Sequence, residues 1–234
     1  MKSLHKTFDI LEYIILQNGK KVLPTEVSEA LDINLATCTR IMGELIKRGY
    51  LEKVSRKAGY IAGPMIVSLN TRDQTYKRIA EAAEEPVRHL SKTLDCQVNI
   101  AVLNQSQRVM LAFHLADPPA FPWQKFRFED HWDTATGRLL LAALEKSAAK
   151  AICRSAGITP FPADYLEQLR KDGFVRFVWN DLCVIGHLIR VPGYPPSAFG
   201  FGVPQKMADR AFELSAATAL KISINLTEPV CQAF

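Results

Sequence analysis

The stretch from Pro24 to Tyr60 constrains the fold of this chain more than any other part. Its apolar residues predict a short helix and then a longer one, with Asp32-Ile33-Asn34 as the turn between them. Two short strands follow at 50–54 and 60–62, around a basic tip that contains a glycine. This order of elements is the layout of a winged helix-turn-helix, which places its second helix in the major groove of DNA.

The longer helix, Leu35 to Arg48, has an apolar face and a polar face. Asn34 is placed to cap its start through the side-chain oxygen. Small and hydroxyl side chains near the start allow a close approach to base edges, and Arg40 follows within reach of a guanine edge or a phosphate. Gly43 lies on the same face, where the backbone itself has room to approach a partner. The predicted buried face consists of Cys38, Ile41, Met42, Leu45 and Ile46.

The residues expected to contact DNA lie on both helices and on the hairpin. The hairpin tip is basic, which suits contact with the sugar–phosphate backbone. Arg56 and Lys57 at the tip, and any single lysine of the set, can alternatively be ordinary solvated surface charges without a DNA contact. The predicted DNA-binding residues are Thr25, Thr37, Thr39, Arg40, Lys47, Lys53, Arg56 and Lys57.

Net charge supports this assignment only weakly. The 234 residues include 29 basic and 24 acidic side chains, a net charge of +5. Residues 1–63 hold ten Lys and Arg against seven Asp and Glu, so the excess leans toward the N-terminal segment. No apolar run approaches the ~18 residues of a membrane span, and the N-terminus lacks a signal-peptide pattern. We therefore expect a cytoplasmic protein with no membrane partner.

Sequence motifs for catalysis, metal binding and nucleotide binding are missing. The five cysteines are far apart without a CxxC pair, which predicts reduced thiols rather than disulfides or a zinc site. The five histidines show no HxH or HExxH spacing, and GxSxG, P-loop and GxGxxG patterns are absent. We therefore predict no catalytic residues, no metal site and no cofactor, and we expect that the chain is not an enzyme.

The remainder of the chain predicts an α+β domain with an antiparallel sheet. Residues 65–93 predict helix with a break at Pro86. A Pro-rich and aromatic segment at 116–131 indicates rings buried over a pocket or at a subunit interface. The strands are expected at 97–104, 108–115, 174–179, 182–191 and 198–203. The predicted domains are a winged helix-turn-helix at 1–63, a connector helix at 64–80 and an effector-binding and oligomerisation domain at 81–234.

Three segments carry a resemblance to a known family. Residues 31–63 resemble the winged helix of IclR-type transcriptional regulators. HWDTATGRLLLAAL, at 131–144, is similar to the family pattern H-x-T-A-x-G-x-x-L-L-A in the helix that floors the effector pocket. YLEQLRKDGF, at 165–174, is similar to L-x-x-I-R-x-x-G-Y. The matched positions of the first segment are Thr37, Arg40, Leu45, Arg48, Gly49, Tyr50, Leu51, Gly59 and Tyr60.

The resemblance implies an N-terminal winged helix-turn-helix and a C-terminal GAF/profilin-like antiparallel-sheet domain with flanking helices. It implies a homodimer or homotetramer on a palindromic operator in double-stranded DNA. The expected role is that of a repressor whose operator affinity is modulated by a small organic acid. A helix N-terminus favours such an anion, although threonines there more commonly cap the helix. The expected ligand-binding residues are Thr134, Ala135, Thr136, Cys183 and His187.

Some positions depart from the family pattern. Leu35 and Ala36 stand where the family usually has Lys-Ser, and Gly200 and Gly202 stand where hydroxyl residues commonly line the pocket. For Cys183 and the neighbouring His187, a buried or edge position is the alternative to a pocket role. The alternative function is therefore a winged-helix protein-interaction module, or a ligand-independent regulator with a degenerate sensor domain.

Overall fold

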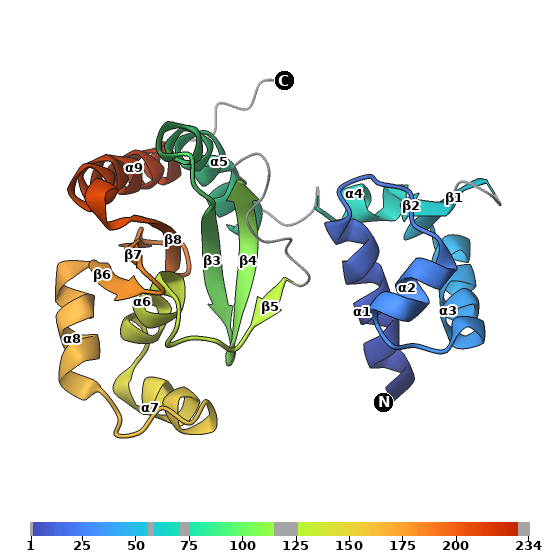
Figure 1. Cartoon of the computed structure of the whole chain (residues 1–234), viewed down its shortest axis with the longest axis horizontal. Helices are drawn as coiled ribbons and strands as arrows, with labels where there is room; N and C mark the ends of the chain where they lie inside the picture. Colours follow the sequence, from blue (N-terminus) through green and yellow to red (C-terminus); the bar gives the residue numbers. More distant parts are fainter. Residues whose placement is uncertain (1, 56–58, 71–74, 115–125, 229–234) are drawn as a thin grey trace. The chain divides into compact units, whose positions relative to one another are not determined.

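The computed structural model describes residues 2–55, 59–70, 75–114 and 126–228 (Figure 1). Arg56, Lys57 and most of the aromatic segment 116–131 lie outside the described residues. The chain divides into two compact units, one mostly before residue 75 and the other mostly from Thr75 onward. Two helices, rather than one, cover the described part of the expected connector 64–80. The predicted division into three parts stays a prediction.

The first unit is a winged helix-turn-helix, as predicted. Its core is apolar and includes Ile14 of the first helix, Val27 of the second and Ile41 of the third. The second helix starts at a proline, whose missing N–H falls where a helix leaves N–H groups unpaired anyway. The elements are α1 (Lys2–Leu16), α2 (Pro24–Ala30), α3 (Leu35–Lys47), β1 (Leu51–Ser55), β2 (Gly59–Ala62) and α4 (Pro64–Asn70).

The hairpin is anchored to the body of this unit through Val22. Val22 and Tyr60 exchange two backbone hydrogen bonds, each 2.9 Å long. Gly59 makes this contact possible, because a Cβ there would lie 2.5 Å from the Val22 carbonyl oxygen and its φ is +89°. The wing therefore extends from a fixed base, although the tip at 56–58 is not among the described residues.

The second unit is an α/β/α sandwich around a six-stranded antiparallel sheet, in agreement with the α+β prediction. The strand order is β5-β4-β3-β8-β7-β6. Helices α5 and α9 pack on one face, and α6 and α8 pack on the other. The strands are β3 (Val98–Asn104), β4 (Gln107–His114), β5 (Arg127–Phe128), β6 (Phe174–Trp179), β7 (Leu182–Ile189) and β8 (Ser197–Pro204). The helices are α5 (Thr75–Leu94), α6 (Ala135–Ala143), α7 (Lys146–Ser155), α8 (Ala163–Asp172) and α9 (Ala208–Thr227), with a 3-10 turn at Gln205–Met207.

The strand alternation separates the side chains of the sheet into two sets. On β7, Cys183, Ile185 and Ile189 belong to the apolar core shared with α5 and α9. Gly186 lies on the opposite face, where a Cβ would lie 2.6 Å from that of Ala135 on α6. Within the described ranges, no helix is long and apolar enough to cross a membrane.

The break predicted at Pro86 is wrong, since α5 continues through this residue. A proline inside a helix leaves the carbonyl four residues earlier without its usual N–H donor. Here that carbonyl belongs to Ala82, and the side-chain amide of Asn225 on α9 donates to it at 2.9 Å. A neighbouring helix thus supplies the hydrogen bond that Pro86 removes, which local sequence rules do not capture.

Candidate functional site

The start of α3 is organised by Asn34. Its side-chain oxygen accepts hydrogen bonds from the backbone N–H of Ala36 at 3.0 Å and of Thr37 at 3.4 Å. This is the predicted cap, and it is confirmed. The predicted buried face is also confirmed for Cys38 and Ile41, together with Met42 and Leu45. Packing through this face turns the opposite face of α3 outward.

The outward face of α3 carries four of the eight residues predicted to bind DNA. Thr39, Arg40 and Lys47 are exposed, and Thr37 is half-buried. The Lys47 ammonium donates to Glu44 at 2.7 Å, and this hydrogen bond lowers the pKa of the Glu44 carboxyl. Lys47 is therefore partly neutralised by its neighbour. Arg40 lies between the hydroxyl-bearing first turns and this ion pair, in the middle of the face.

The other predicted DNA contacts frame this helix. Thr25 is exposed at the start of α2. Lys53 is exposed on β1, and its ammonium lies 5.9 Å from the centre of the Tyr60 ring. The described candidates thus all belong to the first unit, with a central helix flanked by a helix start and a hairpin. An apolar side chain, Leu35, stands at the leading end of α3 with 44% of its surface exposed.

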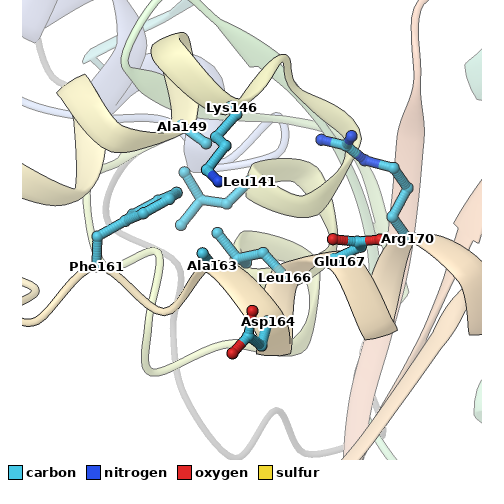
Figure 2. A pocket seen from close by; sticks show the side chains of 9 residues that line it. All are labelled: Leu141, Lys146, Ala149, Phe161, Ala163, Asp164, Leu166, Glu167 and Arg170. Atoms are coloured by element: carbon cyan, nitrogen blue, oxygen red, sulfur yellow. The ribbon is translucent and has the colours of Figure 1, made fainter.

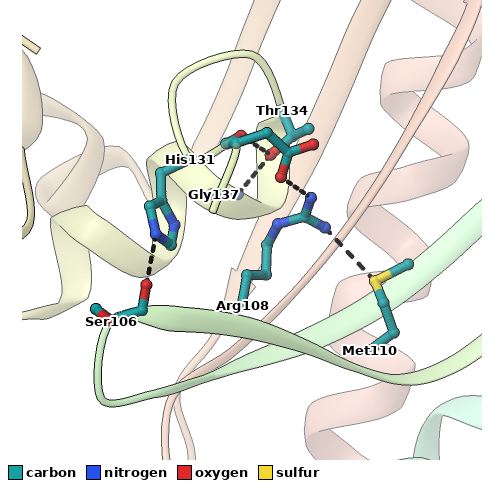
Figure 3. A network of polar contacts seen from close by, with 7 residues as sticks. Ser106, Arg108, Met110, His131, Thr134 and Gly137 are labelled. Carbon is teal, nitrogen blue, oxygen red and sulfur yellow. Dashed lines mark hydrogen bonds and ion pairs between the residues drawn. The ribbon is translucent and has the colours of Figure 1, made fainter. Parts of the chain in front are cut away.

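A polar network in the second unit joins β4 to the segment before α6 (Figure 3). The guanidinium of Arg108 is only 2% exposed, and it pairs with the Asp130 carboxylate at 2.5 Å. The other terminal nitrogen of the guanidinium contacts the Met110 sulfur at 3.5 Å. The guanidinium carbon, Cζ, lies 4.9 Å from the centre of the Phe128 ring. Within the described ranges, its buried Nε has no hydrogen-bond partner. A buried cation with spare donor capacity can hold a carboxylate.

His131 holds the same segment against the β3–β4 turn. Its Nε2 lies 2.8 Å from the Ser106 carbonyl oxygen, which only accepts, so Nε2 carries the proton. Burial lowers the pKa of His131, which leaves the ring neutral near pH 7. The backbone of His131 also lies so close to Gly137 that a Cβ there would be 2.2 Å from the His131 carbonyl oxygen. His131 lies within a motif that is visible in the sequence, but no sequence pattern indicates Arg108 or Asp130, because their pairing depends on contact between distant segments.

The first turn of α6 lies directly on the sheet. The Thr134 hydroxyl accepts from the Gly137 N–H at 3.1 Å and donates to the Asp130 carbonyl at 3.2 Å, so it caps the helix. Ala135 and Thr136 are buried. The Ala135 methyl occupies the space left by two glycines, because a Cβ on Gly200 would lie 3.0 Å from it and one on Gly186 closer still. At these contacts helix and sheet are packed against each other.

Cys183 and His187 do not join the α6 residues, which corrects the predicted five-residue pocket. His187 lies on the α5/α9 face, where its Nε2 lies 2.8 Å from the Ser215 hydroxyl and its ring stacks on Phe199 at 5.5 Å. The Ser215 hydroxyl donates to the Phe212 carbonyl at 2.8 Å, so Nε2 is the donor to Ser215. Burial lowers the pKa of His187 to about 4. Cys183 belongs to the apolar core on that face. The sheet separates both from Thr134, because alternate residues of a strand point to opposite faces.

A cavity of about 70 Å³ opens between α6, α7 and α8 (Figure 2). The Lys146 ammonium points toward the apolar side chains of Leu141 and Phe161. On the far side, Arg170 donates to the Ala142 carbonyl at 2.7 Å and to the Leu144 carbonyl, so it caps the end of α6. This volume is about half that of the apolar cavity of ~150 Å³ that admits benzene. It suits a few waters better than an aromatic ligand.

Comparisons with known proteins connect this arrangement to solved structures only. No family model matches the chain, and a search of curated proteins finds no match. An IclR homolog of Microbacterium hydrocarbonoxydans, complexed with 4-hydroxybenzoate, superposes with a TM-score of 0.71 at 17% identity, covering 96% of this chain and 98% of the other. An IclR transcriptional regulator of Alicyclobacillus acidocaldarius gives 0.66 at 16% identity, over 97% and 99%. The Thermotoga maritima IclR gives 0.63 at 18% identity, over 97% and 100%.

The chain therefore has the fold of IclR-type transcriptional regulators over nearly its whole length. The resemblance seen in the sequence is confirmed at the level of the fold, including the winged helix-turn-helix and the antiparallel-sheet domain. These neighbours are described as regulators or IclR homologs rather than as enzymes.

Proposed function

We propose that this protein is a DNA-binding transcriptional regulator. The observation that carries the proposal is α3, which is capped by Asn34, packed through one apolar face and exposed on a face that bears Thr39 and Arg40. In this role α3 enters the major groove, and the β1–β2 hairpin follows the sugar–phosphate backbone. Thr37 and Thr39 face base edges, and Arg40 donates hydrogen bonds to a guanine edge or to a phosphate. The backbone contacts are assigned to Thr25, Lys47, Lys53, Arg56 and Lys57.

Replacement of Arg40 tests this docking. DNA duplexes are first selected from a random pool by the native chain, and affinity is then measured by fluorescence anisotropy at several salt concentrations. Arg40→Ala is expected to weaken binding roughly 10- to 100-fold, and to reduce the salt slope by about 1 if the contact is to phosphate. Arg210→Ala, an exposed charge in the second unit, is the matched control and is expected to bind as the native chain does. Unchanged affinity and salt slope in Arg40→Ala would contradict the docking.

We infer that the chain acts as a homodimer on a palindromic operator, or as a homotetramer. Exposed apolar side chains on α1 and α4 support self-association: Leu4, Phe8, Met65, Val67 and Leu69. Sedimentation equilibrium of Val67→Glu is expected to show a monomer. Val178→Glu, which changes a similarly exposed residue of β6 in the second unit, is expected to keep the native mass. A native chain that sediments as a monomer would refute the inference.

We further propose that the second unit binds a small organic acid and that the protein is a repressor released by it. The supporting observation is Arg108, a buried guanidinium beside the first turn of α6. The M. hydrocarbonoxydans homolog in complex with 4-hydroxybenzoate adds support from a chain of the same fold. In this proposal Arg108 holds the carboxylate, and the acid binds the DNA-incompetent arrangement more tightly.

Thermal shift and transcription assays test the ligand and the direction of regulation. A panel of small aromatic and aliphatic acids, with 4-hydroxybenzoate included, is expected to raise the Tm of the native chain but not that of Arg108→Met. Expression of a reporter placed downstream of a selected operator is expected to rise when the gene that encodes this chain is deleted. If no acid stabilises the native chain, the close packing of Ala135 on Gly186 and Gly200 favours the ligand-independent alternative.

A winged helix used as a protein-interaction module is the second candidate. The exposed Leu35 at the leading end of α3 and the acidic Glu44 on its outward face favour this use, because neither residue adds positive charge for the DNA phosphates. The same selection experiment discriminates the two functions. A native chain that enriches no duplex would favour the interaction module.

A further inference from the structure

Gly43 is a glycine that the fold does not need. It lies in the interior of α3, which runs without interruption from Leu35 to Lys47. Its backbone does not have the positive φ that favours glycine, and a Cβ built on it would meet nothing within 4 Å. Gly49, not Gly43, follows the end of the helix. The presence of a glycine at position 43 is therefore not explained by backbone conformation, by packing inside the unit or by the end of the helix.

The residue is also unfavourable where it stands. Glycine in a helix interior is less stable than alanine because it loses more backbone freedom on folding. The neighbours of Gly43 on the outward face are Arg40, three residues before it, and Lys47, four residues after it. Gly43 is thus flanked along the helix by the two positive side chains that are assigned to DNA.

We infer that Gly43 is where the backbone of α3 comes closest to DNA, and that its missing Cβ sets the depth of the helix in the major groove. This inference rests on the proposed DNA-binding function. Glycine permits close approach of a backbone to a ligand, and any side chain here would hold the helix away from the base edges. Gly43 is in this sense a positioning residue, which allows Arg40 and Thr39 to reach their contacts.

A substitution series separates this role from a structural one. Gly43→Ala, Gly43→Ser and Gly43→Leu all improve helix propensity, with alanine and leucine ahead of serine. By calorimetry the Ala and Leu chains are expected to have a Tm several degrees above the native value, for a first unit of this size. Anisotropy with the duplex selected by the native chain is expected to show the opposite trend, roughly tenfold weaker binding for Ala and more than 100-fold for Leu.

The outcomes distinguish the inference from the function on which it rests. If the native chain selects no duplex, the proposed function fails. If the native chain binds and Gly43→Ala binds equally well, the proposed function stands and this inference is overturned. A loss of affinity that is the same for Ala, Ser and Leu would also overturn it, because it would reflect helix stiffness rather than space. Ala148→Leu, on an exposed position of α7, is the control and is expected to leave DNA affinity unchanged.

Discussion

The contact between Asn225 and the Ala82 carbonyl makes a quantitative prediction about α5. Pro86 removes the N–H that would normally reach this carbonyl, and the Asn225 amide replaces it at 2.9 Å. Ala82 is 4% exposed, so water has poor access to the carbonyl. Asn225→Ala leaves the acceptor without a partner, and we expect it to lower the free energy of unfolding by about 1–2 kcal/mol.

The same reasoning predicts that Pro86 and Asn225 are thermodynamically coupled. Pro86→Ala restores a backbone N–H that can bond to the Ala82 carbonyl within the helix. In that background Asn225→Ala is expected to cost only a few tenths of a kcal/mol, which gives a coupling energy of about 1 kcal/mol. The backbone carbonyl of Asn225 also accepts from Arg78 at 3.3 Å, but the substitution leaves that contact in place.

Urea denaturation of the four full-length chains measures this coupling directly. Ser223→Ala is the matched control, because the Ser223 hydroxyl on the same helix donates to Ala219 within α9 and not to α5. Its cost is expected to be equal in the native background and in the Pro86→Ala background. An equal cost of Asn225→Ala in the two backgrounds would refute the account of how α5 passes through Pro86.

Three further predictions concern the second unit. Burial holds the pKa of His187 at about 4, below the 6.5 of the unfolded chain, so this residue adds about 3 kcal/mol of stability above pH 6.5 that is lost as pH falls to 4. His187→Phe is therefore expected to flatten the pH dependence of urea unfolding in that range. Asp130→Ala leaves the buried Arg108 without its carboxylate, so a loss of about 2 kcal/mol is expected, most of it recovered when Arg108→Met is added. Gly186→Ala places a Cβ 2.6 Å from that of Ala135, so a loss of about 1–3 kcal/mol is expected. Ala135→Gly in the same chain is expected to recover only part of it, because the new Cβ would still lie 2.9 Å from the Phe199 carbonyl oxygen. Equal stabilities of single and double variants in the last two cases would contradict the packing described for α6 and β4.

Much of the first unit was accessible from the sequence because its signals are local. The spacing of Cys38, Ile41 and Leu45 specifies the buried face of α3 without knowledge of what covers it. Asn34 caps through N–H groups two and three residues away, so its role also follows from sequence distance alone. Tyr60, by contrast, bonds to Val22, and nothing in the local pattern names that partner.

The candidate ligand site was less accessible for the same physical reason. The pattern around Thr134 predicts a helix start, but not that Ala135 rests on two glycines of β7 and β8. The alternation of β7 places Cys183 with His187, but which face α6 covers depends on how distant segments pack. Arg108 occupies a strand position that suits an exposed residue equally well, and its burial depends on contacts with Phe128 and Asp130 from a distant segment.

The sequence alone determined the order of elements in the winged helix-turn-helix and the outward face of α3, because helical and strand periodicities and caps act over a few residues. Tertiary structure decided which side chains meet across the sheet and which glycines are required. It showed that Gly59 and Gly186 are constrained by neighbouring atoms, while Gly43 meets none within 4 Å. Such distinctions depend on atoms brought together from distant parts of the chain, and no local pattern contains them.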